Sequence, residues 1–361
     1  MSYTRILATL VLAPALLAGA ASAQNYTPEP PSATPASCTP IVYVPDGVPE
    51  TAHVLRGPGL LLEGSGAQGS PVAGLRWLRA HMGASQAGRA GNVVVLRASS
   101  AREYTDDFYK YGRFAWVEEI LIPPCAPRAQ LDAMARYVDM ADAIYFAGGD
   151  QSNYARWKGS KLLAAVRRVY ARKGFVGGGS AGLAIQGDLG YDSVAANRLH
   201  AGDDNYEVKS FPAAADPLMP EISFTHLFSW PALAHTITDT HFRARDRFGR
   251  LVTFIARIVN DPRGASPYYG IGIDQGSEVS VEPNGTAILR VDGKSGGAIL
   301  IRGGPVRLVP GKPLRYTVWI AHLAKDGTRF DLLHHRPGVA WTPVTVTGGA
   351  TPVYSKDPYT L

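Results

Sequence analysis

The sequence predicts an α/β fold built on a doubly wound, mostly parallel sheet. Short apolar runs such as "GLLLEG", "NVVVLRAS" and "AIYFAGG" alternate with longer segments of helical periodicity. Strands buried on both faces of a parallel sheet read as continuous apolar runs of this kind. Two runs end in the small and polar residues "AGGDQ" and "GGGSAG". These segments would lie at the carboxyl ends of strands, where doubly wound sheets bind their ligands.

The elements follow in order along the chain. Strands are expected over residues 59–64, 92–99, 114–122, 143–149 and 175–180. Helices are expected over residues 74–82, 128–141 and 152–174, with another beginning at Ala181. A further helix is expected to open at His241, because apolar residues recur at helical spacing up to Val259. After Gly270, short strands separated by Gly, Pro and Asn turns predict a β-rich, antiparallel extension at the edge of the main sheet.

The first 40 residues predict export. Arg5, the apolar stretch 6–20 and Ala21-Ser22-Ala23 have the pattern of a signal peptide over residues 1–23. Residues 24–40 are rich in Pro, Ser and Thr and are expected to form a flexible leader. A secreted or periplasmic location is therefore expected, with no membrane partner.

The cysteine count and the net charge bear on a disulfide bridge and on nucleic-acid binding. In an oxidising compartment Cys38 and Cys125 are expected to form a bridge, although two separate thiols would fit the same count. The net charge is +6 and most basic residues are scattered, so no nucleic-acid partner is expected.

A serine stands in the tightest turn of the predicted sheet. The sequence Gly178-x-Ser180-x-Gly182 joins a strand to a helix and has the form of a nucleophile elbow. Glycines allow such a turn without a Cβ clash, and the N–H of Ala181 at the helix start can face a developing oxyanion. The alternative is that these small residues only make a turn.

Among nine histidines, His241 is the best candidate for a general base. His53, His81, His334 and His335 have no motif around them and are expected to be surface or packed residues. Arginines crowd the region after His241, where repulsion and the helix dipole disfavour them unless an anion binds. The alternative is a solvated basic face.

The segments "AGGDQ", "GGGSAG" and "DTHFRARDRFGRL" together resemble the cyanophycinase branch of the peptidase S51 family, over residues 57–301. The resemblance implies a flavodoxin-like sheet similar to that of class I glutamine amidotransferases. It also implies cleavage of cyanophycin, a poly-aspartate with arginine side groups, to β-aspartyl-arginine dipeptides; relatives are α-aspartyl dipeptidases. A catalytic domain over residues 41–301 is expected, with 302–361 as an extension outside the resemblance.

The resemblance also implies roles for single residues. Ser180 would be the nucleophile and His241 its base, with oxyanion-binding N–H groups from Gly149 and Ala181. The implied substrate-binding residues are Gln151, Asp239, Arg245, Arg247 and Arg250. Asp239 could instead cap a helix, and Gln151 could be only a turn residue. The substrate would carry carboxylate and guanidinium groups. Neither a metal nor a cofactor is expected, and the sequence is compatible with a homodimer.

Two positions depart from the family pattern. Thr240 stands where the family has glutamine, and Gln275 stands where it has the glutamate of the triad. We expect Gln275 to orient His241 through its amide oxygen, with Glu278 as the less favoured alternative. Two other functions fit the same residues. One is an α/β-hydrolase-type esterase using Ser180, Asp239 and His334 or His335; the other is a non-catalytic ligand-binding protein.

Overall fold

The computed structural model describes residues 37–47, 49, 54–65, 72–83, 88–99, 104–203, 206–292 and 296–361. The predicted signal peptide and most of the predicted leader lie outside the described residues. Within the described ranges, no helix combines the length and the apolar composition needed to cross a membrane.

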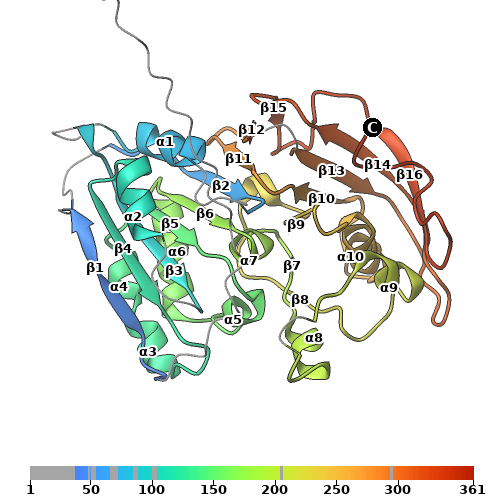
Figure 1. Ribbon diagram of the computed structural model, residues 1–361, viewed down its shortest axis with the longest axis horizontal. Helices are drawn as coiled ribbons and strands as arrows, with labels where there is room; N and C mark the ends of the chain where they lie inside the picture. The colour runs from blue at the N-terminus through green and yellow to red at the C-terminus, as the bar shows by residue number, and fades with distance from the viewer. Residues whose placement is uncertain are drawn as a thin grey trace, which may run out of the picture.

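The larger of two main sheets confirms the mixed α/β prediction (Figure 1). Its order is β1 (Ile41–Gly47), β4 (Trp116–Leu121), β3 (Asn92–Arg97), β5 (Ala143–Phe146), β6 (Phe175–Gly179), β2 (Gly59–Glu63), β11 (Ser277–Val281), β12 (Thr286–Val291) and β15 (Arg329–Asp331). The strands from β4 to β2 pair in parallel, and the outer strands pair antiparallel. The order of the parallel strands differs from the flavodoxin-like order that the resemblance implied. The parallel strand that comes first in the chain, β2, lies at the end of the parallel set, beside β6.

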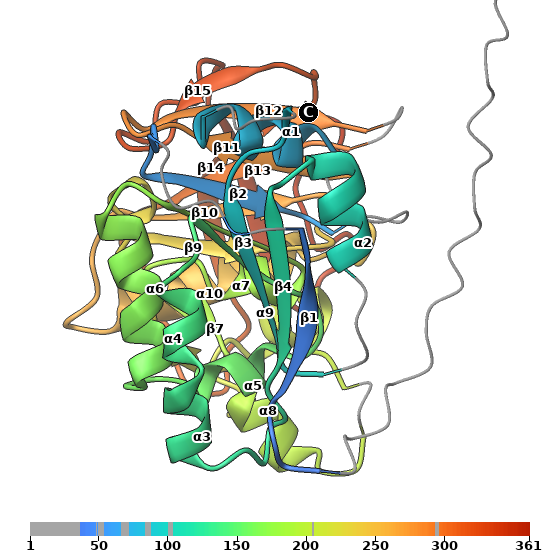
Figure 2. The ribbon, with the colours of Figure 1, turned by 90° about the vertical axis from the view of Figure 1, so that its left-hand side faces the viewer.

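Helices cover both faces of this sheet, as a doubly wound fold requires (Figure 2). Along β2, Leu60 and Leu62 join the core cluster shared with α3 (Arg128–Ala133), α4 (Ala135–Val138) and α6 (Lys161–Ala171). Leu61 points the other way, into the cluster shared with α1 (Val72–His81). The sheet is therefore buried on both sides, which explains its continuous apolar strands.

The second sheet has the order β16 (Thr342–Thr347), β14 (Arg315–Leu323), β13 (Ala298–Gly303), β10 (Tyr268–Ile273) and β9 (Thr236–Asp239). One face carries α10 (Phe248–Asn260) and α9 (Ser210–Ala215), as Figure 1 shows. The β-rich region was expected at the edge of the main sheet; β11, β12 and β15 lie there, whereas β10, β13, β14 and β16 build this second sheet. The predicted boundary after residue 301 falls within β13.

Three predicted helices have different bounds in the structure. The helix predicted over 152–174 is two, α5 (Gln151–Ala155) and α6, because Gly159 has a positive φ of 73° and Ser160 caps α6. The helix over 128–141 divides into α3 and α4. The helix predicted to open at His241 begins at Phe248, and the preceding residues form a turn.

The predicted bridge between Cys38 and Cys125 is present, which confirms that prediction. It ties the segment before β1 to the segment after β4, and β1 pairs antiparallel with β4. The sequence pattern predicts no strand over residues 41–47, because the alternation of apolar and polar residues is weak in this short segment. In the structure it forms the edge strand β1.

Two carboxyl groups are buried side by side in the main sheet. Glu63 of β2 and Glu278 of β11 are paired in register, and Tyr145 of β5 donates a hydrogen bond to Glu63. Burial raises the pKa of Glu63 to about 7. Burial, followed by repulsion from Glu63, raises the pKa of Glu278 to about 8. Both groups are therefore protonated in the folded protein under mildly acidic conditions.

This pair predicts that stability falls as pH rises. Between the unfolded value of 4.5 and the raised folded values, the folded state binds more protons than the unfolded state. The melting temperature should therefore be lower at pH 9 than at pH 5, with a loss on the order of a few kcal/mol. Glu278→Gln should flatten this dependence. An equally steep pH dependence in that variant would contradict the assignment.

Candidate active site

Ser180 occupies a strained turn at the carboxyl end of β6. Its φ of 51° and ψ of −119° are unusual for a residue with a side chain. The flanking glycines are required by space: a Cβ on Gly178 would lie 2.6 Å from the Gly182 backbone, and one on Gly182 would lie 2.0 Å from the Phe146 carbonyl oxygen. The helix α7 (Ala181–Ala184) follows at once. The turn has the geometry of a nucleophile elbow.

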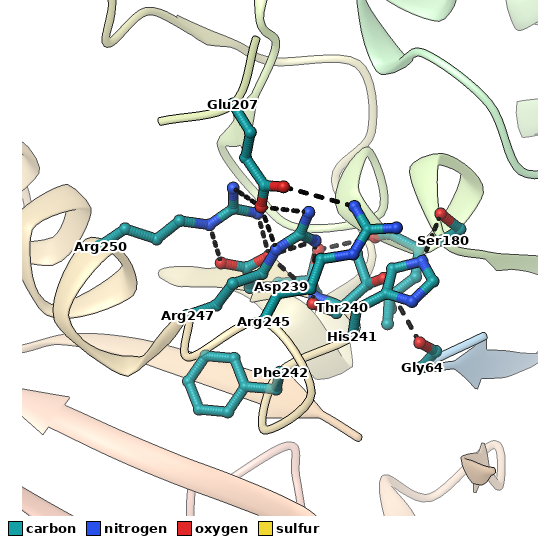
Figure 3. Close-up of polar contacts among 12 residues, drawn as sticks. Gly64, Ser180, Glu207, Asp239, Thr240, His241, Phe242, Arg245, Arg247 and Arg250 are labelled. Atoms are coloured by element: carbon teal, nitrogen blue, oxygen red, sulfur yellow. Dashed lines mark hydrogen bonds and ion pairs between the residues drawn. The ribbon is translucent and has the colours of Figure 1, made fainter. Parts of the chain in front are cut away.

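His241 meets this serine from the other sheet. It follows β9, and its Nε2 lies 2.9 Å from Ser180 Oγ (Figure 3). The backbone N–H of His241 donates to the Gly64 carbonyl at 3.0 Å, which ties the histidine to the end of β2. Its φ is 46°, so the backbone also turns sharply here. His334 contacts Asp331, and His335 contacts Thr236. The base considered for the esterase alternative is therefore not beside Ser180.

Gln275 contacts the second nitrogen of this imidazole. Its amide nitrogen, Nε2, lies 2.7 Å from His241 Nδ1, where the amide oxygen was expected. Rotation of the amide by half a turn exchanges its oxygen and nitrogen. With the oxygen facing His241, Nδ1–H donates to it and Nε2 is free to accept the Ser180 proton. Glu278, the less favoured partner, faces α1 instead: a Cβ on Gly74 of that helix would be 2.8 Å from its carboxyl.

Two residues expected to supply oxyanion-binding N–H groups lie beside the serine. Gly149 and Ala181 both line the same cavity as Ser180. Gly149 has a φ of 124°, a conformation that L side chains rarely adopt, and a Cβ there would lie 2.8 Å from Ser99 Oγ. Within the described residues, neither N–H donates to another protein group. Their role as oxyanion donors stays a prediction.

The cavity at Ser180 has a volume of about 550 Å³. Gln151, at the start of α5, lines it as predicted. Another part of its lining comes from β7 (Gly190–Tyr191), α8 (Val194–Leu199) and the residues after α8, which include Asp203. The wall nearest His241 carries Arg245, Arg247 and Arg250. One cavity therefore brings together carboxylates, arginines and the serine.

The arginine cluster is partly neutralised by the protein itself. Arg250 makes a bidentate pair with Asp239, at 2.6 and 2.8 Å, and also contacts Glu207 at 3.0 Å. Arg247 donates to Glu207 at 2.6 Å and to the Thr240 carbonyl at 2.9 Å (Figure 3). Both arginines are buried, whereas the side chain of Arg245 is 47% exposed and lies 3.4 Å from Glu207.

These contacts correct two interpretations. Asp239 was expected to hold a substrate guanidinium or to cap a helix; instead its carboxylate is buried against Arg250, and α10 begins nine residues later. Arg245 and Arg247 lie before α10, and Arg247 and Arg250 are buried, so these arginines do not form the solvated basic face considered as the alternative. Sequence reasoning missed Glu207, because a single carboxylate more than thirty residues from the arginines carries no local signal.

The electrostatics keep His241 unprotonated. Burial, and then the charges of Arg245, Arg247 and Arg250, lower its pKa to about 2. The imidazole is therefore neutral throughout the range in which proteins are active. A neutral imidazole can accept a proton, but Gln275 supplies no negative charge to stabilise the imidazolium that would form.

Comparisons with known proteins do not show a family for this chain. No protein-family model and no curated protein matches this chain. A peptidase from an acI-B1 actinobacterium has a TM-score of 0.45 at 16% identity, over 76% of this chain and 96% of its own. A candidate peptidase E protein from Listeria monocytogenes EGD-e has a TM-score of 0.40 at 13% identity, over 67% and 100%. Both scores are too low to identify the family or the function of this chain.

The contact between Gln275 and His241 predicts the effect of restoring a charge. Gln275→Glu should raise the pKa of His241 and speed the reaction of Ser180 with a fluorophosphonate by an order of magnitude or more, since an uncharged third member costs about 10⁴ in kcat elsewhere. Glu278→Gln is the matched control and should leave the rate unchanged. A rate loss in the control alone would place the acid at Glu278.

Proposed function

We propose that this protein is a serine hydrolase that cleaves peptides, of the cyanophycinase type. The observation that carries the proposal is the contact between Ser180 Oγ and His241 Nε2 at a strained elbow, in a cavity that Gly149 and Ala181 also line. Strain of this kind persists where the surrounding structure enforces it, and it is common at active sites.

The residues suggest an acyl-transfer mechanism. His241 would accept the Ser180 proton as Oγ attacks the substrate carbonyl, and Gln275 would hold the imidazole in the tautomer that accepts at Nε2. The N–H groups of Gly149 and Ala181 would stabilise the oxyanion. The protonated His241 would then deliver its proton to the leaving amine. Water would hydrolyse the acyl-enzyme by the same route in reverse.

The cavity supports a substrate that carries both signs of charge. Arg245 is half exposed at the basic wall and suits a carboxylate. Asp150 and Asp203 line the same cavity and suit a guanidinium. An aspartyl-arginine unit offers both groups, so we propose cyanophycin or a related aspartyl-arginine peptide as substrate. The predicted leader and the Cys38–Cys125 bridge favour action outside the cytoplasm.

The experiment that tests the function replaces the nucleophile. Ser180→Ala should abolish fluorophosphonate labelling and the release of β-aspartyl-arginine from cyanophycin, measured by mass spectrometry, while the melting temperature stays nearly unchanged. Ser193→Ala, a second serine that lines the cavity, is the matched control and should remain active. Equal turnover in Ser180→Ala and the wild type would refute the assignment.

The neutral Gln275 favours one alternative, a protein that binds such peptides without cleaving them. Such a protein would react slowly with the fluorophosphonate and would not cleave the peptides, although they would still bind in the cavity. Calorimetry with β-aspartyl-arginine on the Ser180→Ala variant measures that binding directly.

The position of Glu207 predicts a change in substrate affinity. Because its carboxylate already occupies the arginine cluster, Glu207→Gln should expose more positive charge and lower KM for carboxylate-bearing peptides several-fold, as charge-assisted pairs with arginine are strong. Steady-state kinetics measure KM. Glu221→Gln, which removes a carboxylate paired with His200 instead, is the control. An unchanged KM in Glu207→Gln would mean that substrate carboxylates bind elsewhere.

A further inference from the structure

The loop that carries His241 has a backbone that must be held in place. His241 and Asp246 both have positive φ, 46° and 43°. Each such residue costs free energy and persists only where its surroundings enforce it. The same loop carries Arg245 and Arg247, so its conformation sets the base and the basic wall together.

The helix after this loop begins with hydroxyl groups from distant segments as its caps. The N–H of Phe248 donates to Tyr359 Oη at 3.0 Å, and that of Gly249 donates to Tyr354 Oη at 3.2 Å. The N–H of Arg250 donates to Ser210 Oγ at 3.0 Å. Caps satisfy the otherwise unpaired N–H groups of a first helical turn and so stabilise the helix start.

The same hydroxyls also hold Asp246. Tyr354 Oη donates to Asp246 Oδ1 at 2.8 Å and Tyr359 Oη donates to it at 3.0 Å. Ser210 Oγ donates to the Asp246 carbonyl. Burial raises the pKa of both tyrosines well above its usual value, so both hydroxyls keep the proton that they donate. The two tyrosines thus bridge the strained residue to the helix start.

Packing connects Tyr359 to the catalytic histidine. Its ring lies 6.1 Å from that of Phe242, the residue next to His241. Phe242 is fully buried over Gly272 of β10, where a Cβ would lie 2.4 Å from its ring. The N–H of Phe242 donates to the Ile273 carbonyl at 3.3 Å. Phe242 is therefore clamped between the second sheet and the C-terminal segment.

Both tyrosines belong to the region after residue 301, for which the sequence predicted no role. They follow β16: Tyr354 forms a bridge with Val346, and the N–H of Ser355 donates to the Thr345 carbonyl at 3.0 Å. The strands β14 and β16 thus hold Tyr354 at the helix start, and Tyr359 follows five residues later.

We propose that Tyr354 and Tyr359 form a clamp that positions the His241 loop for reaction with Ser180. They are positioning residues, since they contact the loop and not the substrate cavity. The inference rests on the proposed Ser180 site, and it gives the C-terminal extension a part in that site's activity.

The test removes hydroxyl groups alone. Tyr354→Phe, Tyr359→Phe and the double variant are compared with Tyr316→Phe, in which a buried tyrosine of β14 loses a 2.6 Å bond to the Gly304 carbonyl. Two readouts are taken: the rate of Ser180 labelling by a fluorophosphonate, and hydrogen exchange of the peptide containing residues 241–250. The melting temperature shows how much stability each variant loses.

We expect the double variant to label Ser180 on the order of tenfold more slowly, because small displacements of a catalytic group cost large factors in rate. Exchange in residues 241–250 should be faster. Tyr316→Phe should lower the melting temperature comparably and change neither readout. If the double variant does not fold, the two single variants decide by the same readouts.

Other outcomes separate this inference from the proposed function. Labelling at the wild-type rate in the Tyr→Phe variants would overturn the clamp, because the hydroxyls would then serve stability alone. Absence of labelling in the wild type would refute the proposed function instead. In that case hydrogen exchange decides the clamp: faster exchange in residues 241–250 supports it, and unchanged protection overturns it.

Discussion

The buried pair between Asp239 and Arg250 is the interaction on which the site depends. It joins the last residue of β9 to the first turn of α10, with both side chains almost fully buried. The intervening residues must therefore close a tight loop, and His241 lies in it. Breaking one partner of a buried pair leaves an uncompensated charge, which is strongly destabilising. Glu207 and Arg247 extend the pair into a network that reaches the cavity.

The site forms where the two sheets meet. Ser180 comes from the end of β6 in the main sheet, whereas His241 follows β9 in the second sheet. Gln275 lies in the short connection by which the chain passes from β10 in the second sheet to β11 in the main sheet. The bond from the His241 N–H to the Gly64 carbonyl crosses the same junction. Any change in how the sheets pack therefore alters all three residues together.

The electrostatics of this junction are unusual for a site with a serine and a histidine. Burial of the imidazole, and then the charges of three arginines, lower its pKa to about 2, and its neighbour at Nδ1 is a neutral amide. The base is always ready to accept a proton, but its cation is poorly stabilised. The chain's acidic groups are used elsewhere: Asp239 and Glu207 neutralise arginines, and Glu278 is buried beside Glu63.

The sequence by itself determined the features that depend on local pattern. Apolar runs predicted the parallel strands, and two glycines around Ser180 predicted the elbow, because short-range sterics and burial leave a mark on neighbouring residues. The motif around His241 predicted its place beside the serine, and the departure at Gln275 located the contact with His241 Nδ1. Only the tertiary structure decided the second sheet, the start of α10 at Phe248, and the partners Glu207, Tyr354 and Tyr359. These contacts join residues far apart in the chain, and their energies depend on burial and on three-dimensional proximity, which no local pattern encodes.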